Sequence, residues 1–425
     1  MGLITPLGTD VEKAWQHLLN GGSGMVPIAH FDASTFPSQF AAQVKDYSLA
    51  DVIGAEAAER HATASLNTRF ALGAARRAWD GAGLADNPPQ DMTRVGVYLG
   101  GGEGPLDFEN FAAAAILGWE KDGDDEHLNT VKWAAAARER LNSMFELEQE
   151  PNLAASHIAA LLNVRGPSFN TLTACAASTQ AIGEATCIIR RGDADLMISG
   201  GAHSMIHPLG VTGFNRLTAL STRNDSRTTA SRPFDRTRDG FVLGEGASML
   251  IIEELEHARA RGANILAEVC GYGSTADAFR ITDIHETGRG AIAAMQQAID
   301  DAGLTIDDID YISAHGTSTE ENDKVETLAI RTLFAHRAQE VPISSIKSMM
   351  GHLIAAAGAT ELITCVLAIR DGVIPPTMNY EHPDPNCDLD YVPNQARKVP
   401  VKTALSNSFG FGGQNDTIVI RKFEE

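Results

Sequence analysis

The sequence predicts an α/β protein made of two halves with the same order of helices and strands. Two observations predict this fold class: a repeated order of helix, glycine stop and strand, and strands that are apolar along their whole length. "RFALGAARRAWDGAGL" (69–84) then "RVGVYLGGG" (94–102) indicates a helix, a glycine stop and an apolar strand. "RGAIAAMQQAIDDAGL" (289–304) then "IDYISAHGT" (309–317) repeats that order. The strands "VGVYLG", "ADLMISG", "ASMLIIEEL" and "DTIVIR" are continuous apolar runs. Such runs are typical of sheets that are covered on both faces.

A second pair of segments also repeats one order of elements. The helix that starts near Cys175 leads into "GDADLMISGG", and the one that starts near His352 leads into "LAIRDGVIPPT". We therefore expect a duplication that divides the chain near residues 255–270, with one half over 1–260 and the other over 261–425. Coincidence is the alternative, because a helix, a glycine stop and a strand form a common unit.

Three stretches depart from this plan. Residues 102–150 carry "GWEKDGDDEHLNT" and a charged helical pattern, which indicates an insertion over the first half that covers a pocket mouth or is only solvated surface. Residues 374–400 are rich in proline and predict a long irregular connection. The opening "MGLITPLG" is so abrupt that we expect the first strand to be missing or displaced.

Composition limits the classes of function. The 425 residues exceed one ordinary core, and 44% hydrophobic with 21% charged residues excludes general disorder. A net charge of -21 argues against a nucleic-acid partner, although a local basic patch for an acidic protein stays open. The five cysteines form no CxxC pair, which favours a reduced, cytoplasmic setting. No apolar run reaches the roughly 18 residues of a membrane span.

Cys175 is the cysteine whose surroundings suit a nucleophile. It stands at an expected strand-to-helix turn, after "FNTLTA" and before the alanine-rich "AASTQAIGEATCIIRR". Small neighbours leave room for a substrate, and the free amides of a first helical turn favour a thiolate and can bind an oxyanion. A buried structural thiol is the alternative at this position. We assign the other cysteines to core or surface.

Two histidines lie at glycine-flanked ends of elements in the second half. His315, in "ISAHGTSTEEND", ends an apolar strand, and His352, in "KSMMGHLIAAAGATE", opens an alanine-rich helix. A histidine at a helix N-terminus tends to be neutral, and neutral imidazole can donate its ring N–H to a carbonyl oxygen that becomes negative. Each histidine alone also fits a structural role. A zinc site is not expected, because ligand spacings such as HxxxH or CxxC are missing.

The stretch "SNSFGFGGQND" (406–416) is a candidate gate. Its glycines permit close backbone approach, and Phe409 and Phe411 can cover an apolar entrance. A glycine-rich hairpin before the last strand is the alternative.

The motifs "TACAAS", "AHGTST", "KSMMGH" and "NSFGFGG" follow one another in the order and spacing of one known family. The chain resembles the elongating β-ketoacyl-(acyl-carrier-protein) synthases of type II, over nearly its whole length. The stretches "GPSFNTLTAC", "LSTRNDS" and "ASRPFDRTRDGFVLGEGA" agree. The resemblance implies a duplicated thiolase-like fold with five αβαβα layers and a cytoplasmic homodimer. It also implies a reaction without a metal or cofactor, since the pantetheine arrives on the acyl carrier protein.

The resemblance also implies roles for single residues. Cys175 would take the acyl group from the acyl carrier protein, and His315 and His352 would bind the malonyl thioester, assist its decarboxylation and stabilise the enolate. The backbone amides of Cys175 and Phe411 would form the oxyanion hole. Further expected site residues are the pantetheine contacts Thr317 and Thr319, the orienting Lys347, and a charged network behind the histidines that joins Lys347 to Asp323, Glu326 and Glu361.

The same resemblance predicts the dimer contact and exposes departures from the family. We expect strand 195–199 to pair across a two-fold axis. Glu320, Glu321 and Asn322 stand where the family commonly has Pro-x-Gly. Glu103 stands where an apolar residue normally limits the acyl tunnel, so we expect either that it points to solvent or caps a helix that starts in "PLDFENF", or that it is paired inside the tunnel.

Two alternatives have the same fold. A ketosynthase of a specialised polyketide or unusual-lipid pathway would carry out the same chemistry. A chain-length factor is a non-catalytic partner subunit that lacks the nucleophile, and Cys175 argues against it.

Overall fold

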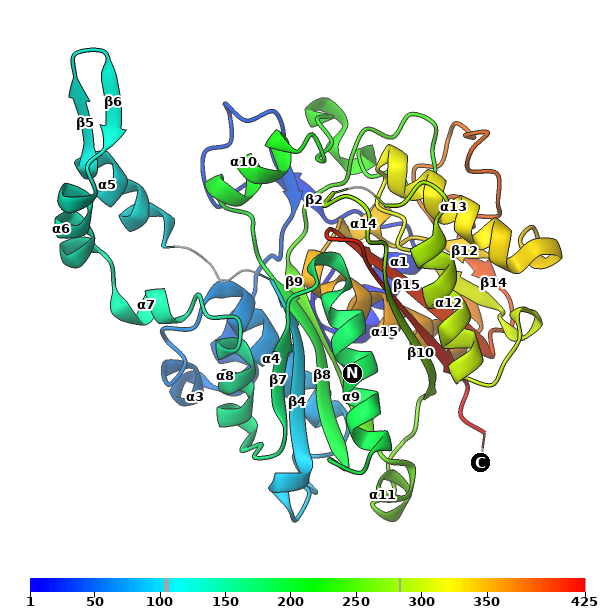
Figure 1. The fold of residues 1–425 in the computed structure, drawn as a ribbon. Helices are drawn as coiled ribbons and strands as arrows, with labels where there is room; N and C mark the ends of the chain where they lie inside the picture. The colour runs from blue at the N-terminus through cyan, green and yellow to red at the C-terminus, as the bar shows by residue number, and fades with distance from the viewer. Residues whose placement is uncertain (103–106, 283, 425) are drawn as a thin grey trace.

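The computed structural model describes residues 1–102, 107–282 and 284–424. It contains two five-stranded sheets, one from each half of the chain (Figure 1). The first runs in the order β1 (Gly2–Ile4), β9 (Gly246–Glu253), β8 (Leu196–His203), β4 (Val95–Gly101) and β7 (Ser168–Thr171). The second runs in the order β10 (Glu268–Ala276), β16 (Gln414–Arg421), β15 (Thr403–Gly410), β11 (Tyr311–Ser313) and β12 (Ile343–Ser344).

The two sheets repeat one pattern of strand directions. In each sheet the first three strands are antiparallel and the last three are parallel. β4, which follows helix α4 (Leu66–Gly81), and β11, which follows α12 (Arg289–Asp301), both take the fourth place. The duplicated plan that the sequence predicts is therefore present in the topology.

Helices cover both faces of both sheets and give five layers. α4 and α8 (Leu153–Leu162) pack on the outer face of the first sheet, and α12 with α13 (Glu320–Phe334) on the outer side of the second. The middle layer consists of α9 (Ala177–Arg190) and α15 (Ala357–Asp371), which contact each other and both sheets. The expected αβαβα architecture is confirmed. It brings the starts of α9 and α15 together between the halves.

The middle layer is close-packed because its contact residues are small. A side chain at Gly358 of α15 would lie 1.9 Å from Oγ1 of Thr179 on α9. The Thr179 hydroxyl in turn bonds Ser408 of β15 at 2.7 Å. These contacts fix the two helices against each other and against the second sheet.

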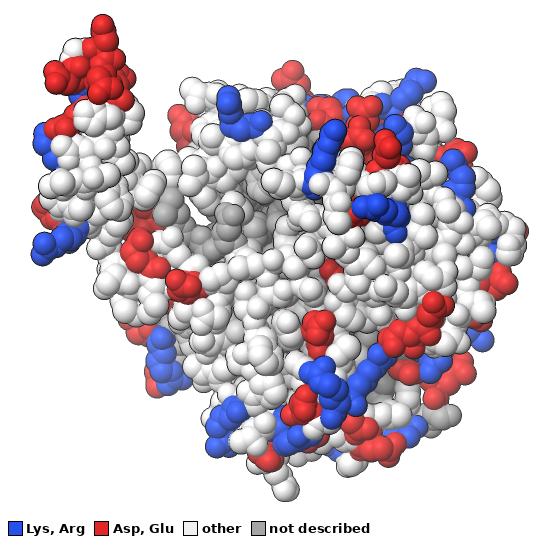
Figure 2. All heavy atoms as spheres, viewed as in Figure 1, with Lys and Arg blue, Asp and Glu red and all other residues white. Residues whose placement is uncertain are grey.

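Residues 107–147 form an arm that stands away from the body (Figure 1). It consists of α5 (Phe108–Gly118), a hairpin of β5 (Trp119–Asp122) and β6 (Asp125–Leu128), α6 (Thr130–Arg140) and α7 (Ser143–Leu147). Its tip is acidic (Figure 2), and Ile116, Trp119 and Val131 expose 74%, 54% and 79% of their surface. The expected insertion is present, but it projects outward instead of lying flat on the first half.

The remaining elements connect these layers. They are α1 (Val11–Leu19), β2 (Met25–Pro27), β3 (Phe40–Ala42), α2 (Leu49–Ile53), α3 (Ala55–Glu59), α10 (Pro208–Arg216), α11 (Leu255–Ala260), α14 (Lys347–Met350), β13 (Val373–Ile374) and β14 (Arg397–Lys398). No helix in the described ranges is both long and apolar enough to cross a bilayer.

Two sequence predictions about the strands are wrong. The opening residues do form a strand, since β1 pairs with β9 from Gly2 to Ile4. Residues 196–199 of the predicted strand 195–199 belong to β8, whose two edges are bonded to β9 and β4, so this strand cannot pair with a second copy. The long connection predicted over 374–400 is present: it holds only the short strands β13 and β14, which pair with each other, and it separates α15 from the sheet strand β15.

Candidate active site

Cys175 lies in a short 3₁₀ turn, residues Ala174–Ala176, between β7 and α9. The turn is tight, because Ala174 has a φ of 48°. The thiol is 6% exposed and belongs to an apolar cluster with Phe241, Leu243 and Ile354. The strand-to-helix placement that the sequence predicts is confirmed.

The expected thiolate is not supported. Burial raises the pKa of Cys175 to about 12, and this exceeds the lowering by the charge of Lys347 and by the backbone N–H groups of Phe411 and Cys175. Desolvation by the apolar cluster outweighs the amides at the start of α9. The free protein therefore holds a thiol, with two backbone N–H groups directed at its sulfur.

His352 follows α14 and Gly351, whose φ of 69° suits glycine. Its backbone N–H donates to the carbonyl of Val242 at 2.8 Å. Its ring Nδ1 accepts a hydrogen bond from the backbone N–H of Ile354 at 3.2 Å, which leaves the ring proton on Nε2. Nε2 has no hydrogen-bond partner in the described part of the chain.

His315 follows β11 and is held from two sides. Its backbone N–H donates to Glu326 at 2.8 Å, and its Nδ1 lies 3.4 Å from the ammonium of Lys347. Because an ammonium can only donate, Nδ1 is the acceptor and the ring proton is again on Nε2. The rings of His315 and His352 lie 5.3 Å apart at 82°.

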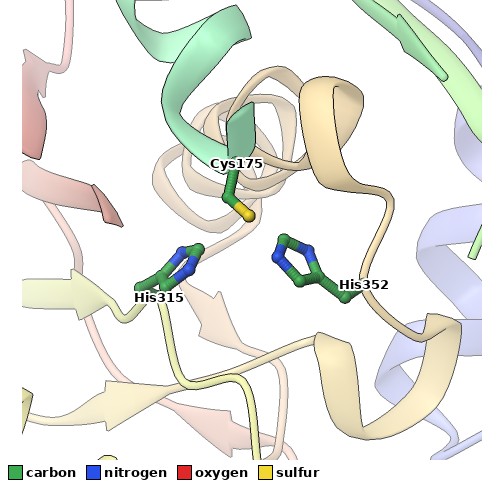
Figure 3. Close-up of side chains that lie close together, drawn as sticks. All are labelled: Cys175, His315 and His352. Atoms are coloured by element: carbon green, nitrogen blue, oxygen red, sulfur yellow. The ribbon is translucent and has the colours of Figure 1, made fainter. Parts of the chain in front are cut away.

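Cys175, His315 and His352 meet at one point (Figure 3). The sulfur and one ring nitrogen of each histidine lie within 4.8 Å of one another, although the three residues come from distant segments. Burial, and then the charge of Lys347, holds the pKa of both histidines well below 6.5. Both rings are therefore neutral, and each presents an N–H.

The same three atoms also form a geometric metal-ligand set. The missing HxxxH and CxxC spacings therefore do not by themselves argue against zinc, because metal ligands can also come from separate segments. The Lys347 ammonium, 3.4 Å from His315, repels a cation at this point.

The charged residues behind the histidines are connected through the backbone of His315 and through the amide of Asn322, which donates to Asp323 at 3.1 Å and to Glu326 at 3.5 Å. Lys347 bonds the carbonyl of His315 and forms an ion pair with Glu361 on α15. Glu326 accepts the N–H groups of His315 and Gly316, both at 2.8 Å.

Asp323 also holds a second segment of the chain. It accepts the backbone N–H of Phe234 at 2.7 Å and pairs with Arg238 at 3.6 Å. Arg238 also pairs with Asp384 at 2.6 Å. Sequence reasoning missed Arg238, although it stands in the quoted stretch "ASRPFDRTRDGFVLGEGA".

A pocket of about 420 Å³ opens onto Cys175. Both expected gate residues, Phe409 and Phe411, line it, and so do Thr317 and Thr319, whose hydroxyls bond each other at 2.8 Å. Its mouth includes Glu320 and Glu321 in the first turn of α13. Lining residues that the sequence did not single out are Leu217, Thr218, Ala219, Asp239, Phe241, Thr282, Ile284 and Ile354.

Glu103 lies outside the described residues. The helix expected in "PLDFENF" is present, because α5 begins at Phe108 and Asp107 accepts the N–H of Asn110 as its cap.

Comparisons with known proteins show which family the chain belongs to. The family models "Beta-ketoacyl synthase, N-terminal domain" and "Beta-ketoacyl synthase, C-terminal domain" match residues 1–258 and 266–381. The chain belongs to the β-ketoacyl synthase family. The β-ketoacyl synthases most similar to it include the 3-oxoacyl-[acyl-carrier-protein] synthase 2 of Coxiella burnetii, which is 41% identical over 424 residues, 99% of this chain and 97% of that one.

Solved β-ketoacyl synthases have the same fold along the whole chain. The enzyme from Burkholderia phymatum has a TM-score of 0.88 and 30% identity, covering 100% of this chain and 98% of that one. A type II polyketide ketosynthase, solved with its acyl-carrier protein and bound to a hexaketide, has a TM-score of 0.82 and 34% identity over the same shares.

Proposed function

We propose that the protein is an elongating β-ketoacyl-(acyl-carrier-protein) synthase of fatty acid biosynthesis, an acyltransferase that extends an acyl chain by two carbons. The observation that carries this proposal is the meeting of one thiol and two neutral imidazole N–H groups at the base of a pocket. A 41% identical relative with the name 3-oxoacyl-[acyl-carrier-protein] synthase 2 supports it.

In the first half-reaction the sulfur of Cys175 attacks the carbonyl of an acyl thioester. A new carbon–sulfur bond forms, the pantetheine sulfur leaves, and the thiol proton passes to it. The backbone N–H groups of Cys175 and Phe411, which are directed at Sγ, are placed to bind the oxyanion of the tetrahedral intermediate. Because burial raises the pKa of the thiol, the sulfur keeps its proton until it attacks, and the proton then goes to the departing pantetheine sulfur.

In the second half-reaction the pocket binds a malonyl thioester. Nε2–H of His315 and of His352 donate to its thioester oxygen, which becomes negative as carbon dioxide leaves. The enolate carbon then attacks the acyl carbonyl on Cys175, a carbon–carbon bond forms, and the Cys175 sulfur leaves and regains a proton. The reaction needs no metal or redox cofactor, because the leaving carbon dioxide drives bond formation.

We also propose that both thioesters arrive on an acyl carrier protein. The solved polyketide ketosynthase in complex with its acyl-carrier protein supports this partner. Thr317 and Thr319 line the path of a pantetheine arm from the pocket mouth to Cys175. A reduced, cytoplasmic location fits the five cysteines, none of which forms a disulfide.

We propose a homodimer that pairs along β7. β7 is bonded only to β4, so its other edge is free in the described structure, and the neighbouring Phe169 and Leu172 are 51% and 54% exposed. α8, which follows the arm in the chain, packs beside β7. A second copy on this edge would therefore also lie within reach of the apolar face of the arm.

The test of the activity is turnover with acyl carrier proteins loaded with chains of different length and with malonyl-carrier protein as extender. We expect a 3-oxoacyl product two carbons longer and release of carbon dioxide. Acylation without condensation, or condensation only with coenzyme A thioesters, would contradict the proposal. Light scattering of Phe169→Lys, with Leu255→Lys on α11 as a matched control, tests the dimer: only the first should yield monomer.

A further inference from the structure

His203 is a buried histidine that the reaction does not use. It is the last residue of β8 and is 1% exposed, and both of its ring nitrogens lack a hydrogen-bond partner in the described chain. Burial lowers its pKa to about 3, so the ring is neutral, with one nitrogen donating and the other accepting. Buried polar groups without a partner are rare in native proteins and call for a bound water, a ligand or a functional reason.

The sheet places His203 at the edge where the active site lies. β8, β4 and β7 are parallel neighbours, so their carboxyl ends meet at one edge. His203 ends β8, Gly102 follows β4, and the turn with Cys175 follows β7. Ligands of α/β proteins bind at the carboxyl ends of parallel strands. Among the residues just named at this edge, His203 offers two polar atoms without a partner in the described structure.

The side chain of His203 also points to the middle layer of the fold, where Cys175 lies. Two residues earlier, a side chain at Gly201 would lie 2.3 Å from the carbonyl of Ala355 and 2.7 Å from Cβ of Ser178. Because side chains alternate along a strand, His203 points to this same face. Ser178 lies on α9, just after Cys175, and Ala355 follows Ile354, which lines the pocket.

Space for the imidazole ring exists because its neighbour is a glycine. A Cβ at Gly102 would lie 2.3 Å from Nδ1 of His203. The other side chains around the thiol, among them Ile206, Leu243 and Ile354, form an apolar cluster. A saturated acyl chain on Cys175 would be covered by this cluster but would leave the nitrogens of His203 unpaired. A chain that carries an oxygen would pair one of them.

We propose that His203 is a specificity-determining residue that forms a hydrogen bond with a keto or hydroxyl oxygen on the acyl chain bound to Cys175. Saturated chains remain substrates, and among chains of equal length one with an oxygen at the depth of His203 is then bound more tightly than its saturated counterpart. This inference rests on the proposed function only in that it requires an acyl group on Cys175.

A competition experiment tests the proposal on the first half-reaction. The full-length protein is mixed with equal amounts of the octanoyl thioester and one oxo-octanoyl thioester of acyl carrier protein, with the keto group at carbon three, five or seven in turn. Mass spectrometry of the peptide that contains Cys175 gives the ratio of the two adducts. The ratio does not depend on how much of a variant is folded, because both adducts form on the same molecules.

We expect wild type to favour at least one keto chain, and His203→Leu to lower that ratio about tenfold, the effect of one lost hydrogen bond. His203→Gln retains a donor and an acceptor and should recover part of the preference. His61→Leu is the matched control, since His61 is also buried but its Nδ1 is paired with His157 at 2.8 Å, and its ratio should equal that of wild type.

The outcomes separate this inference from the proposed function. No adduct on Cys175 with any thioester overturns the proposed function. Adducts that form in the same ratio in wild type and His203→Leu overturn the role of His203 and indicate that its nitrogens bind only water.

Discussion

The backbone N–H of Ile354 donates to Nδ1 of His352 at 3.2 Å, and this single contact decides what the histidine can do. With Nδ1 occupied, the ring proton must be on Nε2, which is the nitrogen that faces Cys175 (Figure 3). His315 reaches the same state through a different donor, the ammonium of Lys347. The two histidines are therefore paired donors, and neither is a general base in the resting protein.

Replacement of the nucleophile should separate the two half-reactions. Cys175→Ala removes the acyl-enzyme but leaves both histidine N–H groups in place. We expect no elongation, while malonyl-carrier protein still loses carbon dioxide. Release of labelled carbon dioxide measures the second activity. In wild type the acyl adduct should appear on Cys175 alone, and an adduct on Cys187, Cys270, Cys365 or Cys387 would contradict the assignment.

Loss of either histidine should slow decarboxylation more than acylation. If each N–H stabilises the enolate, His315→Ala and His352→Ala each lose about a hundredfold in decarboxylation, as for one oxyanion-hole donor. In the proposed mechanism acyl transfer uses the backbone N–H groups of Cys175 and Phe411, so it should be less affected. Rapid-quench acylation assays measure it. Equal losses in both half-reactions would show that the histidines also serve acyl transfer.

The raised pKa of Cys175 predicts how the free thiol reacts. A thiol with a pKa of about 12 is mostly protonated across the neutral range, so its thiolate fraction rises about tenfold for each pH unit. The rate of iodoacetamide alkylation, measured by peptide mass spectrometry, should therefore keep rising from pH 6 to pH 9 (about this range is accessible to the folded protein). A plateau below about pH 8 would mean that the amides at the start of α9 dominate after all.

The charge of Lys347 should be visible in the pH profile of decarboxylation. Burial, and then this charge, lowers the pKa of both histidines, so wild type keeps neutral rings well below pH 6.5. Lys347→Met with Glu361→Gln replaces the buried ion pair by neutral groups, which avoids an unpaired buried charge. The histidine pKa values then rise, and decarboxylation should begin to fall at a higher pH than in wild type. Identical profiles would assign Lys347 a purely structural role.

The close contact in the middle layer gives a stability prediction. A methyl group at Gly358 has to displace Thr179 of α9, so Gly358→Ala should lower the free energy of unfolding by about 2 kcal/mol. Gly213→Ala in α10 is the control, because open space surrounds that position and alanine favours a helix. Urea unfolding measures both, and equal stabilities would show that the two helices can move apart freely.

Much of the fold follows from local sequence patterns. The continuous apolar strands and the glycine stops of α4 and α12 are short-range signals, and the structure has these elements close to the expected places. The position of strand 195–199 in its sheet was predicted wrongly, because strand order depends on which distant segments pair and an apolar run does not encode its neighbours. The outward direction of the arm was not predicted for a similar reason, because local sequence does not encode whether a segment contacts distant parts of the chain.

For the site, too, some features could be predicted from local sequence and others depend on contacts between distant segments. Cys175, His315 and His352 could be identified in the sequence because they lie in stretches rich in glycine and alanine and within the family motifs. The pKa of the thiol could not, because it depends on Phe241, Leu243 and Ile354, which come from other parts of the chain. The unpaired nitrogens of His203 are equally invisible in sequence, since a missing partner is a property of the packed interior.

The middle layer of the fold also bears on how the two copies of the ancestral unit can diverge. The thiol belongs to the helix start of one half and His352 to the corresponding helix start of the other, so each copy holds only part of the reaction centre. Changes on the outer layers, or additions such as the arm, leave that contact untouched. Changes in α9 or α15 must be matched by the opposite copy, which ties the evolution of two halves into that of one enzyme.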